Sequence, residues 1–430
     1  MQKNQVKYQV LVSVMLISIL ISCKPLGKKS IHKKIEKQTS EIFDDLVEIR
    51  RDFHSYPELA GNEKRTSKII AEYLTNLGLE VKTDATGYGV VGILKGGKEG
   101  KSIAWRADMD ALPNDLPDEV PYKSENKGIQ HGCGHDVHMA IGLGIATVLA
   151  KNKESIKGTV YFIFQPEEET FVGAKNIVNS RLYSELNIEE IYALHVTAFP
   201  VGKIMVKPNE LYAYQKIMQI KFNSELSKED AAEIHHQIRS ETLRKKDESR
   251  PWEFSKAFDT IGGLGDSNTI FKDYLFVDER FFIEEDTNGL TIITEVYETN
   301  KSNTHDILPK IKEIISKSEY KDKFISMSFI QENPTVLNHK LLTKNAINTL
   351  TEVYGNNSVT ISYGQIPYFN DDFIYFQQKT SGVYFLLGGS NLGKGIISMN
   401  HAPNFGVDEE CIKIGVKSFS SLILERTNGE

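Results

Sequence analysis

Apolar positions recur with two different periods along the first half of the chain. Residues 42–49 and 69–77 carry apolar side chains at helical spacing, which predicts two amphipathic helices. Three short apolar runs, residues 102–105, 159–164 and 191–194, are typical of buried strands. The pattern therefore predicts an α/β arrangement in which helices alternate with strands.

Each predicted strand runs directly into side chains that can carry chemistry. In chain order these side chains are Asp108 and Asp110, then Glu167, Glu168 and Glu169, then His195. Ligands of open α/β sheets bind just beyond the carboxyl ends of the strands. One such carboxylate alone is typical of a helix cap or a surface ion pair, but the whole set predicts one polar pocket at this edge.

The segment HGCGHDVHMA, residues 131–140, gathers three histidines, a cysteine and an aspartate in a chain that has only 11 His and 3 Cys. An apolar stretch over residues 140–149 follows and is expected to be a helix. Cys133 would then lie at a helix N-terminus, which favours a thiolate. Two interpretations compete at this point: a metal site, and a thiol nucleophile with a histidine base.

Composition limits the classes of function. A length of 430 residues suggests two domains. The net charge of -7 and the isoelectric point near 6.0 argue against a nucleic-acid binder, which would show a basic patch. Cys133 and Cys411 could form a disulfide in an oxidising compartment. The place of Cys411 at the edge of an apolar helical stripe favours a small buried residue instead, and the sequence leaves both open.

The first 23 residues have the features of a bacterial lipoprotein signal peptide. Lysines precede an apolar run over residues 10–21, which is shorter than the roughly 20 residues that a membrane-spanning helix needs. The run ends in LISC, which resembles a lipobox, so Cys23 is expected to carry lipid and to anchor the chain in the bacterial cell envelope. A cleaved secretory signal and an uncleaved anchor are the alternatives. The lysine-rich residues 24–40 are expected to be a polar tether.

Seven segments follow one another along the chain: HSYPELAGNE, RADMDALP, HGCGHDVH, FQPEEETFVGA, ALHVTAFPVG, NDDF and NHAPNFGVDE. Together they resemble the motif series of the amidohydrolase branch of the aminoacylase and carboxypeptidase G-type metallopeptidases, which includes hippurate hydrolase and the auxin-conjugate hydrolases. The resemblance implies an α/β catalytic domain, with a mixed sheet flanked by helices and a di-metal centre. It also implies a smaller α+β lid domain inserted at residues 214–330, between catalytic parts 41–213 and 331–430.

By motif match, the resemblance implies metal ligands and a general base. The ligands would be Cys133, bridging the two ions, with His135, Glu169, His195 and His401, and the base would be Glu168. Asp110 matches an aspartate that orients the site. Asp108 stands where relatives outside this branch have a histidine ligand, and His138 is expected to be structural.

The chemistry of amide hydrolysis agrees with these roles. A divalent ion can activate water near neutral pH, and a carboxylate beside it can pass a proton to the departing amine. Adjacent glutamates suit this division, because neighbouring side chains leave a loop in different directions. A thiol nucleophile would leave Glu168, Glu169, His195 and His401 without a role, so the metal interpretation is favoured. Sulfur, nitrogen and oxygen ligands suit two zinc ions, or manganese or cobalt in their place.

The lid segment follows the expected pattern only in part. Ser227 begins a capping-box-like helix start, and apolar spacing over residues 307–315 predicts a second helix. The resemblance implies a glycine–histidine segment whose histidine reaches substrate, often across a dimer interface, but the lid has none. His235, His236 and His305 are expected at the surface.

Two hypotheses for function follow. The first is a lipid-anchored, metal-dependent amidohydrolase that cleaves N-acyl amino acids or small peptides, and that could form a homodimer through the lid. The second is a binding lipoprotein that keeps the pocket without turnover. Glu168 favours the enzyme, because a pure binding site needs no general base beside its ligands.

Overall fold

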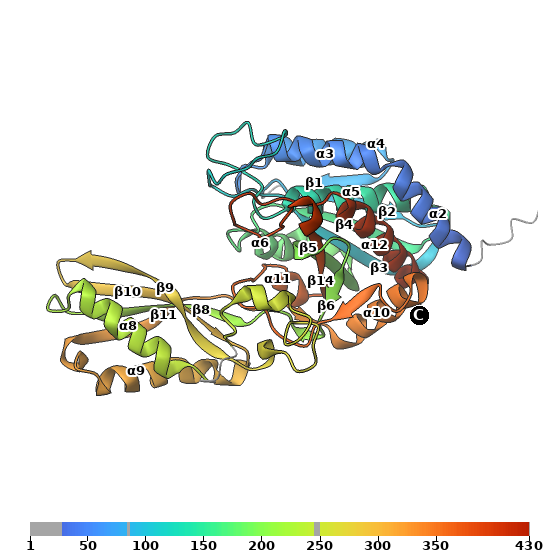
Figure 1. Cartoon of the computed structure of the whole chain (residues 1–430). Coiled ribbons are helices and arrows are strands. Elements are labelled where there is room, and N and C mark those ends of the chain that lie inside the picture. The colour runs from blue at the N-terminus through green and yellow to red at the C-terminus, as the bar shows by residue number, and fades with distance from the viewer. Residues whose placement is uncertain (1–27, 84–86, 245–249, 430) are drawn as a thin grey trace, which may run out of the picture.

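The computed structural model describes residues 28–83, 87–244 and 250–429 (Figure 1). The expected signal peptide and Cys23 lie outside the described residues. Within the described ranges, no helix is both long enough and apolar enough to cross a bilayer.

The larger part of the molecule is built on an eight-stranded mixed sheet. Its strands, in spatial order, are β1 (Glu80–Thr83), β2 (Val90–Lys95), β4 (Lys157–Gln165), β3 (Lys98–Asp108), β5 (Glu190–Pro200), β14 (Ser381–Ser390), β6 (Ile204–Val206) and β13 (Val359–Ile361). β3 lies between β4 and β5 and runs parallel to both, so the carboxyl ends of the three strands predicted from sequence meet at one edge. The expected α/β class with a mixed sheet is confirmed.

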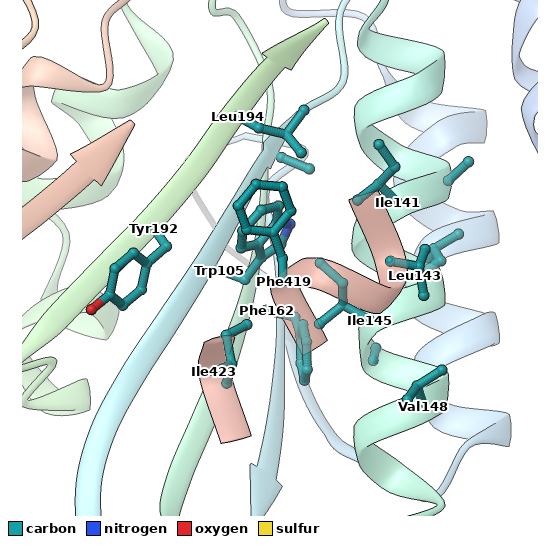
Figure 2. Close-up of a cluster of buried hydrophobic side chains, with 14 of the residues drawn as sticks. Trp105, Ile141, Leu143, Ile145, Val148, Phe162, Tyr192, Leu194, Phe419 and Ile423 are labelled. Carbon is teal, nitrogen blue, oxygen red and sulfur yellow. The ribbon is translucent and has the colours of Figure 1, made fainter. Parts of the chain in front are cut away.

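Helices cover both faces of this sheet. One face carries α2 (Lys28–Glu41), α3 (Phe43–Ser55), α4 (Lys64–Asn76), α5 (His135–Ala150), α10 (Lys340–Tyr354) and α12 (Glu410–Asn428). The other face carries α6 (Gly173–Asn179), α7 (Arg181–Leu186) and α11 (Ile374–Gln377). Figure 2 shows the core of the first face, where the Trp105 ring of β3 packs 4.9 Å from the Phe419 ring of α12.

The central helix α5 is buried on all sides between the sheet and its neighbours α3 and α12. It begins at His135, earlier than the apolar run of residues 140–149 predicts, because His135, Asp136 and His138 are buried with their own polar partners. The reactive segment is therefore part of the folded core.

The expected tether is wrong for residues 28–40, which belong to helix α2. Ile31 and Ile35 lie one turn apart and are buried against α12, while Lys33 and Lys34 face solvent. His32 adds a 3.0 Å hydrogen bond between its Nδ1 and the Ser421 hydroxyl. The two isoleucines give the segment an apolar face, so it packs as an amphipathic helix although it is rich in lysine.

A second, four-stranded antiparallel sheet projects away from the larger part (Figure 1). Its strands, in spatial order, are β11 (Phe324–Glu332), β8 (Tyr214–Phe222), β10 (Gly289–Glu298) and β9 (Leu275–Asp286), and α8 (Lys228–Thr242) and α9 (Ile307–Lys317) pack on it around a separate apolar core. We call residues 214–330 the lid. The capping box predicted at the start of α8 is present between Ser227 and Asp230.

The lid histidines are only partly where the sequence predicts them. His236 and His305 are exposed, but His235 is buried between α8 and the lid sheet. Its ring stacks on Phe281 with centroids 4.2 Å apart, and its Nε2 lies 3.2 Å from the Thr294 hydroxyl. The surface expectation for His235 is wrong because this residue adjoins Ile234 on the apolar face of the helix.

The chain enters and leaves the lid at neighbouring points. β7 (Asn209–Glu210) and β12 (Leu337–Asn338) pair with each other just outside the lid segment. The remaining short 3-10 helices are η1 (Lys153–Ser155), η2 (Phe254–Phe258), η3 (Ile270–Lys272), η4 (Lys301–Asp306), η5 (Lys321–Lys323) and η6 (Leu392–Lys394).

Candidate metal centre

Five candidate ligands converge on the carboxyl edge of the main sheet. They form two groups that share one cysteine: Cys133, His135 and His195 in the first, and Cys133, Glu169 and His401 in the second. Within each group the ligand atoms lie within 4.8 Å of one another. The Cys133 sulfur is 3.3 Å from His195 Nε2 and 3.1 Å from His401 Nε2. The structure therefore brings together all five residues, with the sulfur between the two groups.

The ligand atoms that face the centre suit a pair of divalent ions. His135 Nδ1 donates to the Asp110 carbonyl oxygen at 2.8 Å, and His195 Nδ1 donates to the Val196 carbonyl oxygen at 2.8 Å. Each ring is thus fixed so that Nε2 faces the centre, as is usual for histidines that bind metal. His135 Nε2 is buried without a hydrogen-bond partner, and Glu169 Oε1 lies 3.3 Å from His401 Nε2. A bound cation would give His135 Nε2 and Glu169 Oε1 a common partner.

Two buried carboxylates hold the loop that carries the glutamates. The backbone N–H of Glu167 donates to Glu63 Oε1 at 2.9 Å. The N–H groups of Glu168 and Glu169 donate to the two oxygens of Asp110, both at 3.0 Å. Three successive N–H groups are therefore fixed by two side chains, and Glu167 has a left-handed φ of 58°. We call this arrangement the glutamate-loop clamp.

A buried ion-pair cluster lies behind Glu168. The Arg106 guanidinium contacts Asp108 at 2.6 Å, Asp372 at 3.0 Å and Asp371 at 3.2 Å. Its Nε also donates to the Gln165 amide oxygen at 2.8 Å. Three carboxyl groups thus surround one cation, and two of them, Asp371 and Asp372, lie next to the Glu168 carboxylate.

The two residues whose roles the sequence left least defined are bonded to each other. His138 Nδ1 lies 2.6 Å from Asp108 Oδ1, and the Val196 backbone N–H donates to His138 Nε2 at 2.8 Å. Both nitrogens of His138 are therefore engaged by protein groups, which supports its structural interpretation. Asp108 acts as an acceptor for both Arg106 and His138.

The surroundings of the centre shift the pKa values of its cysteine and glutamates, and the helix N-terminus is not the main influence. Burial, followed by the Glu169 and Glu168 carboxylates, raises the pKa of the Cys133 thiol well above its usual value, contrary to the expected thiolate. Burial and the neighbouring Asp371 raise the pKa of Glu168 well above its usual value. Burial opposes ionisation of Glu169, but the neighbouring His401 and His135 imidazoles together outweigh it and lower the pKa of Glu169. A divalent cation beside the sulfur would favour the thiolate.

The disulfide that the sequence left open is not formed. Cys133 and Cys411 are both free and buried, and Cys411 packs in the apolar core as the helical stripe predicts. A thiol at Cys133 is therefore available to bind metal.

A cavity of about 520 Å³ opens over the centre. Cys133, Glu168 and His401 of the larger part line the cavity. Gln215 and Arg280 reach it from the lid of the same chain. Its size is in the range of small-molecule sites.

Sequence reasoning missed several residues of the site. Glu63, Asp371 and Asp372 lie inside the segments HSYPELAGNE and NDDF, so the motif series marked their positions without assigning them roles. Their partners are distant in sequence, and only the fold brings them together.

Comparison with known proteins finds one matching family and relatives that span nearly the whole chain. The sequence model of the family described as Peptidase family M20/M25/M40 matches residues 104–425. The chain is 30% identical over 413 residues to thermostable carboxypeptidase 1 of Saccharolobus solfataricus, covering 92% of this chain and 99% of the relative. It is 27% identical over 445 residues to an IAA-amino acid hydrolase of Arabidopsis thaliana, covering 96% of this chain and 93% of the relative.

A solved structure agrees with the fold. The YXEP protein of Bacillus subtilis, described as a dinuclear metal binding peptidase from the M20 family, superposes with a TM-score of 0.70 at 23% identity. The match covers 90% of this chain and 99% of that chain. The family match over residues 104–425 and the relative at 30% identity confirm the resemblance drawn from the seven sequence motifs.

Proposed function

Because the chain belongs to the peptidase family M20/M25/M40, and is therefore a metal-dependent hydrolase of amide or peptide bonds, we propose that it cleaves N-acyl amino acids or small peptides. The observation that carries this proposal is the pair of ligand groups that share Cys133, with Glu168 beside them. A carboxylate next to a metal-ligand set can act as the general base for hydrolysis by metal-activated water.

We assign the metal-binding role to Cys133, His135, Glu169, His195 and His401. Two zinc ions suit this donor set, and manganese or cobalt could replace them. When bound, the ions supply Lewis-acid activation of water and of the scissile carbonyl. Asp110 serves the site twice, because its carbonyl oxygen orients His135 and its carboxylate holds the glutamate loop.

Glu168 is assigned the proton transfer. Its carboxylate lines the cavity, and its Oε2 lies 3.7 Å from His135 Nε2. Burial and the nearby Asp371 raise its pKa, so a proton taken from water is held until it is delivered to the leaving nitrogen. The divalent ions, when bound, would favour the ionised form that takes this proton. A carboxylate with an ordinary pKa would hold the transferred proton less well at neutral pH.

The substrate class is supported by the cavity and by the relatives. A volume of about 520 Å³ admits an acylated amino acid or a dipeptide. The relatives named above are a carboxypeptidase and an IAA-amino acid hydrolase, both of which act on a bond to an amino acid. Lid residues of the same chain reach the cavity, which supports turnover by a lid without a glycine–histidine segment. Homodimerisation through the lid stays a separate proposal, tested by sedimentation.

Replacement of Glu168 by glutamine tests the enzyme directly. The change keeps the shape of the side chain and removes the proton-accepting charge, so turnover should fall roughly 10²–10⁴-fold. Metal content should stay at two equivalents, because no assigned ligand changes. Glu167→Gln is the matched control, since Glu167 does not line the cavity, and it should retain turnover.

The panel for this experiment contains N-acyl amino acids and dipeptides, with released amine as the readout. Near wild-type turnover by Glu168→Gln would show that another group carries the proton. A wild-type protein that binds these amides and hydrolyses none would replace the enzyme with the binding-lipoprotein alternative.

We further propose that Cys23 is acylated and that the protein is anchored in the bacterial cell envelope. The proposal rests on the LISC sequence after the apolar run of residues 10–21. Mass spectrometry of the N-terminal peptide should show a diacylated or triacylated cysteine, and Cys23→Ala should abolish the modification. An unmodified N-terminus at another residue would exclude the anchor.

A further inference from the structure

One end of the larger part is rich in lysine. Three segments meet there: residues 28–38 of α2, residues 95–101 where β2 turns into β3, and residues 151–157 between α5 and β4. They hold five, three and three lysines, and each segment holds one glutamate and no aspartate. The net charge of the whole chain is -7, so this concentration of positive charge is local. We call the three segments the basic end.

Direct contacts join the segments of the basic end. The side-chain amide of Asn152 donates to Gln38 Oε1 of α2 at 2.5 Å. The backbone N–H of Gly97 donates to the carbonyl oxygen of Lys153 at 3.2 Å. The lysines of segments that lie far apart in the sequence are therefore gathered on one part of the molecule.

Neighbouring carboxylates neutralise only part of this charge. Three of the lysines form ion pairs: Lys37 with Glu41, Lys95 with Glu80 and Lys101 with Glu190. Six more are exposed and form no ion pair with another described residue: Lys33, Lys34, Lys98, Lys151, Lys153 and Lys157. Of the three glutamates, Glu36 already pairs with Lys417 at 3.1 Å, which leaves Glu99 and Glu154. The basic end therefore keeps an excess of exposed positive charge.

Two of the exposed lysines are neighbours in the main sheet. Lys98 and Lys157 are paired in register where β3 and β4 begin. Like charges placed this close repel each other. An anionic partner would relieve this repulsion and would meet further lysines on both sides.

The basic end lies opposite the candidate metal centre. It contains the amino ends of β3 and β4, whereas the centre lies at the carboxyl edge of the same sheet. The 11 residues of β3 separate the two edges by about 30 Å. Figure 1 shows α2 at the end of the larger part that points away from the lid. A partner at the basic end would therefore leave the cavity open.

The proposed anchor indicates which anionic partner this end meets. Helix α2 begins at Lys28, five positions after the proposed acylated Cys23. Acyl chains inserted in a bilayer would bring the basic end close to the headgroups. Anionic lipids attract lysines that lie near the membrane surface, and this attraction falls off within about a Debye length.

Resting in part on the proposed anchor, we propose that the basic end is a docking surface for anionic phospholipid headgroups. Docking in this orientation directs the candidate metal centre away from the bilayer. The contact is electrostatic, so it weakens as the salt concentration rises.

Vesicle flotation of residues 24–430 tests the docking surface. This chain contains every described residue and lacks the proposed signal peptide and the acylated cysteine. Its binding is compared on phosphatidylcholine vesicles with and without about 30% phosphatidylglycerol. The apparent affinity should be at least roughly tenfold higher with phosphatidylglycerol. This difference should disappear at about 1 M salt, where the Debye length is about 3 Å.

A triple charge reversal locates the contact. Lys34→Glu, Lys153→Glu and Lys157→Glu together should lower the affinity for the anionic vesicles roughly tenfold or more. The three side chains are exposed, and a glutamate at position 157 would lie beside Lys98, so the fold should be kept. Urea titration checks this. The matched control reverses three exposed lid lysines and should keep wild-type affinity: Lys301→Glu, Lys312→Glu and Lys321→Glu.

Equal binding to both kinds of vesicle, or binding to neither, would overturn the docking surface. Equal weakening by the two triple variants would also overturn it, because net charge alone would then explain the effect. The tested chain carries no acyl group and the assay involves no hydrolysis. These outcomes are therefore independent of the mass spectrum of the Cys23 peptide and of the Glu168→Gln experiment.

Discussion

Replacing Asp110 by asparagine should disrupt the glutamate-loop clamp without removing any assigned metal ligand. The two carboxylate oxygens of Asp110 accept the N–H groups of Glu168 and Glu169, both at 3.0 Å. Asparagine keeps one acceptor oxygen and places an amide NH₂ where the second oxygen stood. One N–H of the loop would then face a donor in a buried site. The carbonyl bond to His135 comes from the backbone and would remain.

The magnitude follows from these two bonds. A hydrogen bond to a charged group contributes about 1.5–3 kcal/mol, and a buried N–H left without a partner costs about 1–3 kcal/mol. The loop can relieve part of this by moving, which displaces the carboxylates of Glu168 and Glu169. Since about 1.4 kcal/mol is a factor of ten, the perturbation is large enough to lower metal affinity or kcat by roughly 10–100-fold, as residues that orient metal ligands commonly do.

Competition with a chromophoric zinc chelator measures the affinity, and steady-state kinetics give kcat and KM separately. Asp115→Asn is the matched control, because the Asp115 carboxylate accepts the Gly128 N–H at 2.6 Å in an exposed loop. This control should change neither metal affinity nor kcat. If Asp110→Asn retains wild-type values for both quantities, then the clamp does not position the glutamates and our reading of Asp110 is wrong.

Three further predictions concern the buried groups of the site. Cys133→Ser should lower the metal content well below two equivalents by elemental analysis, because both ligand groups share this sulfur. His138→Phe should lower the free energy of unfolding by about 1–3 kcal/mol in urea titrations, since it leaves buried partners unpaired, yet it should keep two metal equivalents. Burial raises the pKa of Glu63 from 4.5 to about 7, so the folded state holds this proton more tightly than the unfolded state. That contribution to stability is complete below pH 4.5 and is lost as the pH rises through 7. Glu63→Gln should therefore lose less stability than wild type between pH 5 and pH 8. If urea titrations show that both proteins lose the same free energy of unfolding over this range, the result contradicts the raised pKa.

Strand positions could be predicted from the sequence where apolar runs were short and bounded. The runs that became β3, β4 and β5 are buried along most of their length, and their ends carry the reactive side chains. The candidate metal ligands followed from residue types in a recognisable series of motifs, and the structure places them together.

Long-range partners could not be predicted in the same way. Asp371 reaches Arg106 across 265 positions of the chain, and Glu63 reaches Glu167 across 104. Nothing local in the sequence encodes such a pairing. Helix α2 was missed because its lysines hide an apolar spacing of only two isoleucines. His235 was misplaced because its side chain is polar, although its position on α8 is apolar.

Helix α2 also limits how far the body of the protein could stand from a membrane. It begins at Lys28, and only the chain from position 23 to position 28 separates it from the proposed acylated cysteine. A stretch of that length reaches at most about 18 Å when fully extended. Because α2 is packed into the core through Ile31 and Ile35, the helix itself provides no additional slack. An anchored molecule would therefore work close to the lipid headgroups. Substrates held in the cell wall at a greater distance would have to be released and then diffuse to the protein.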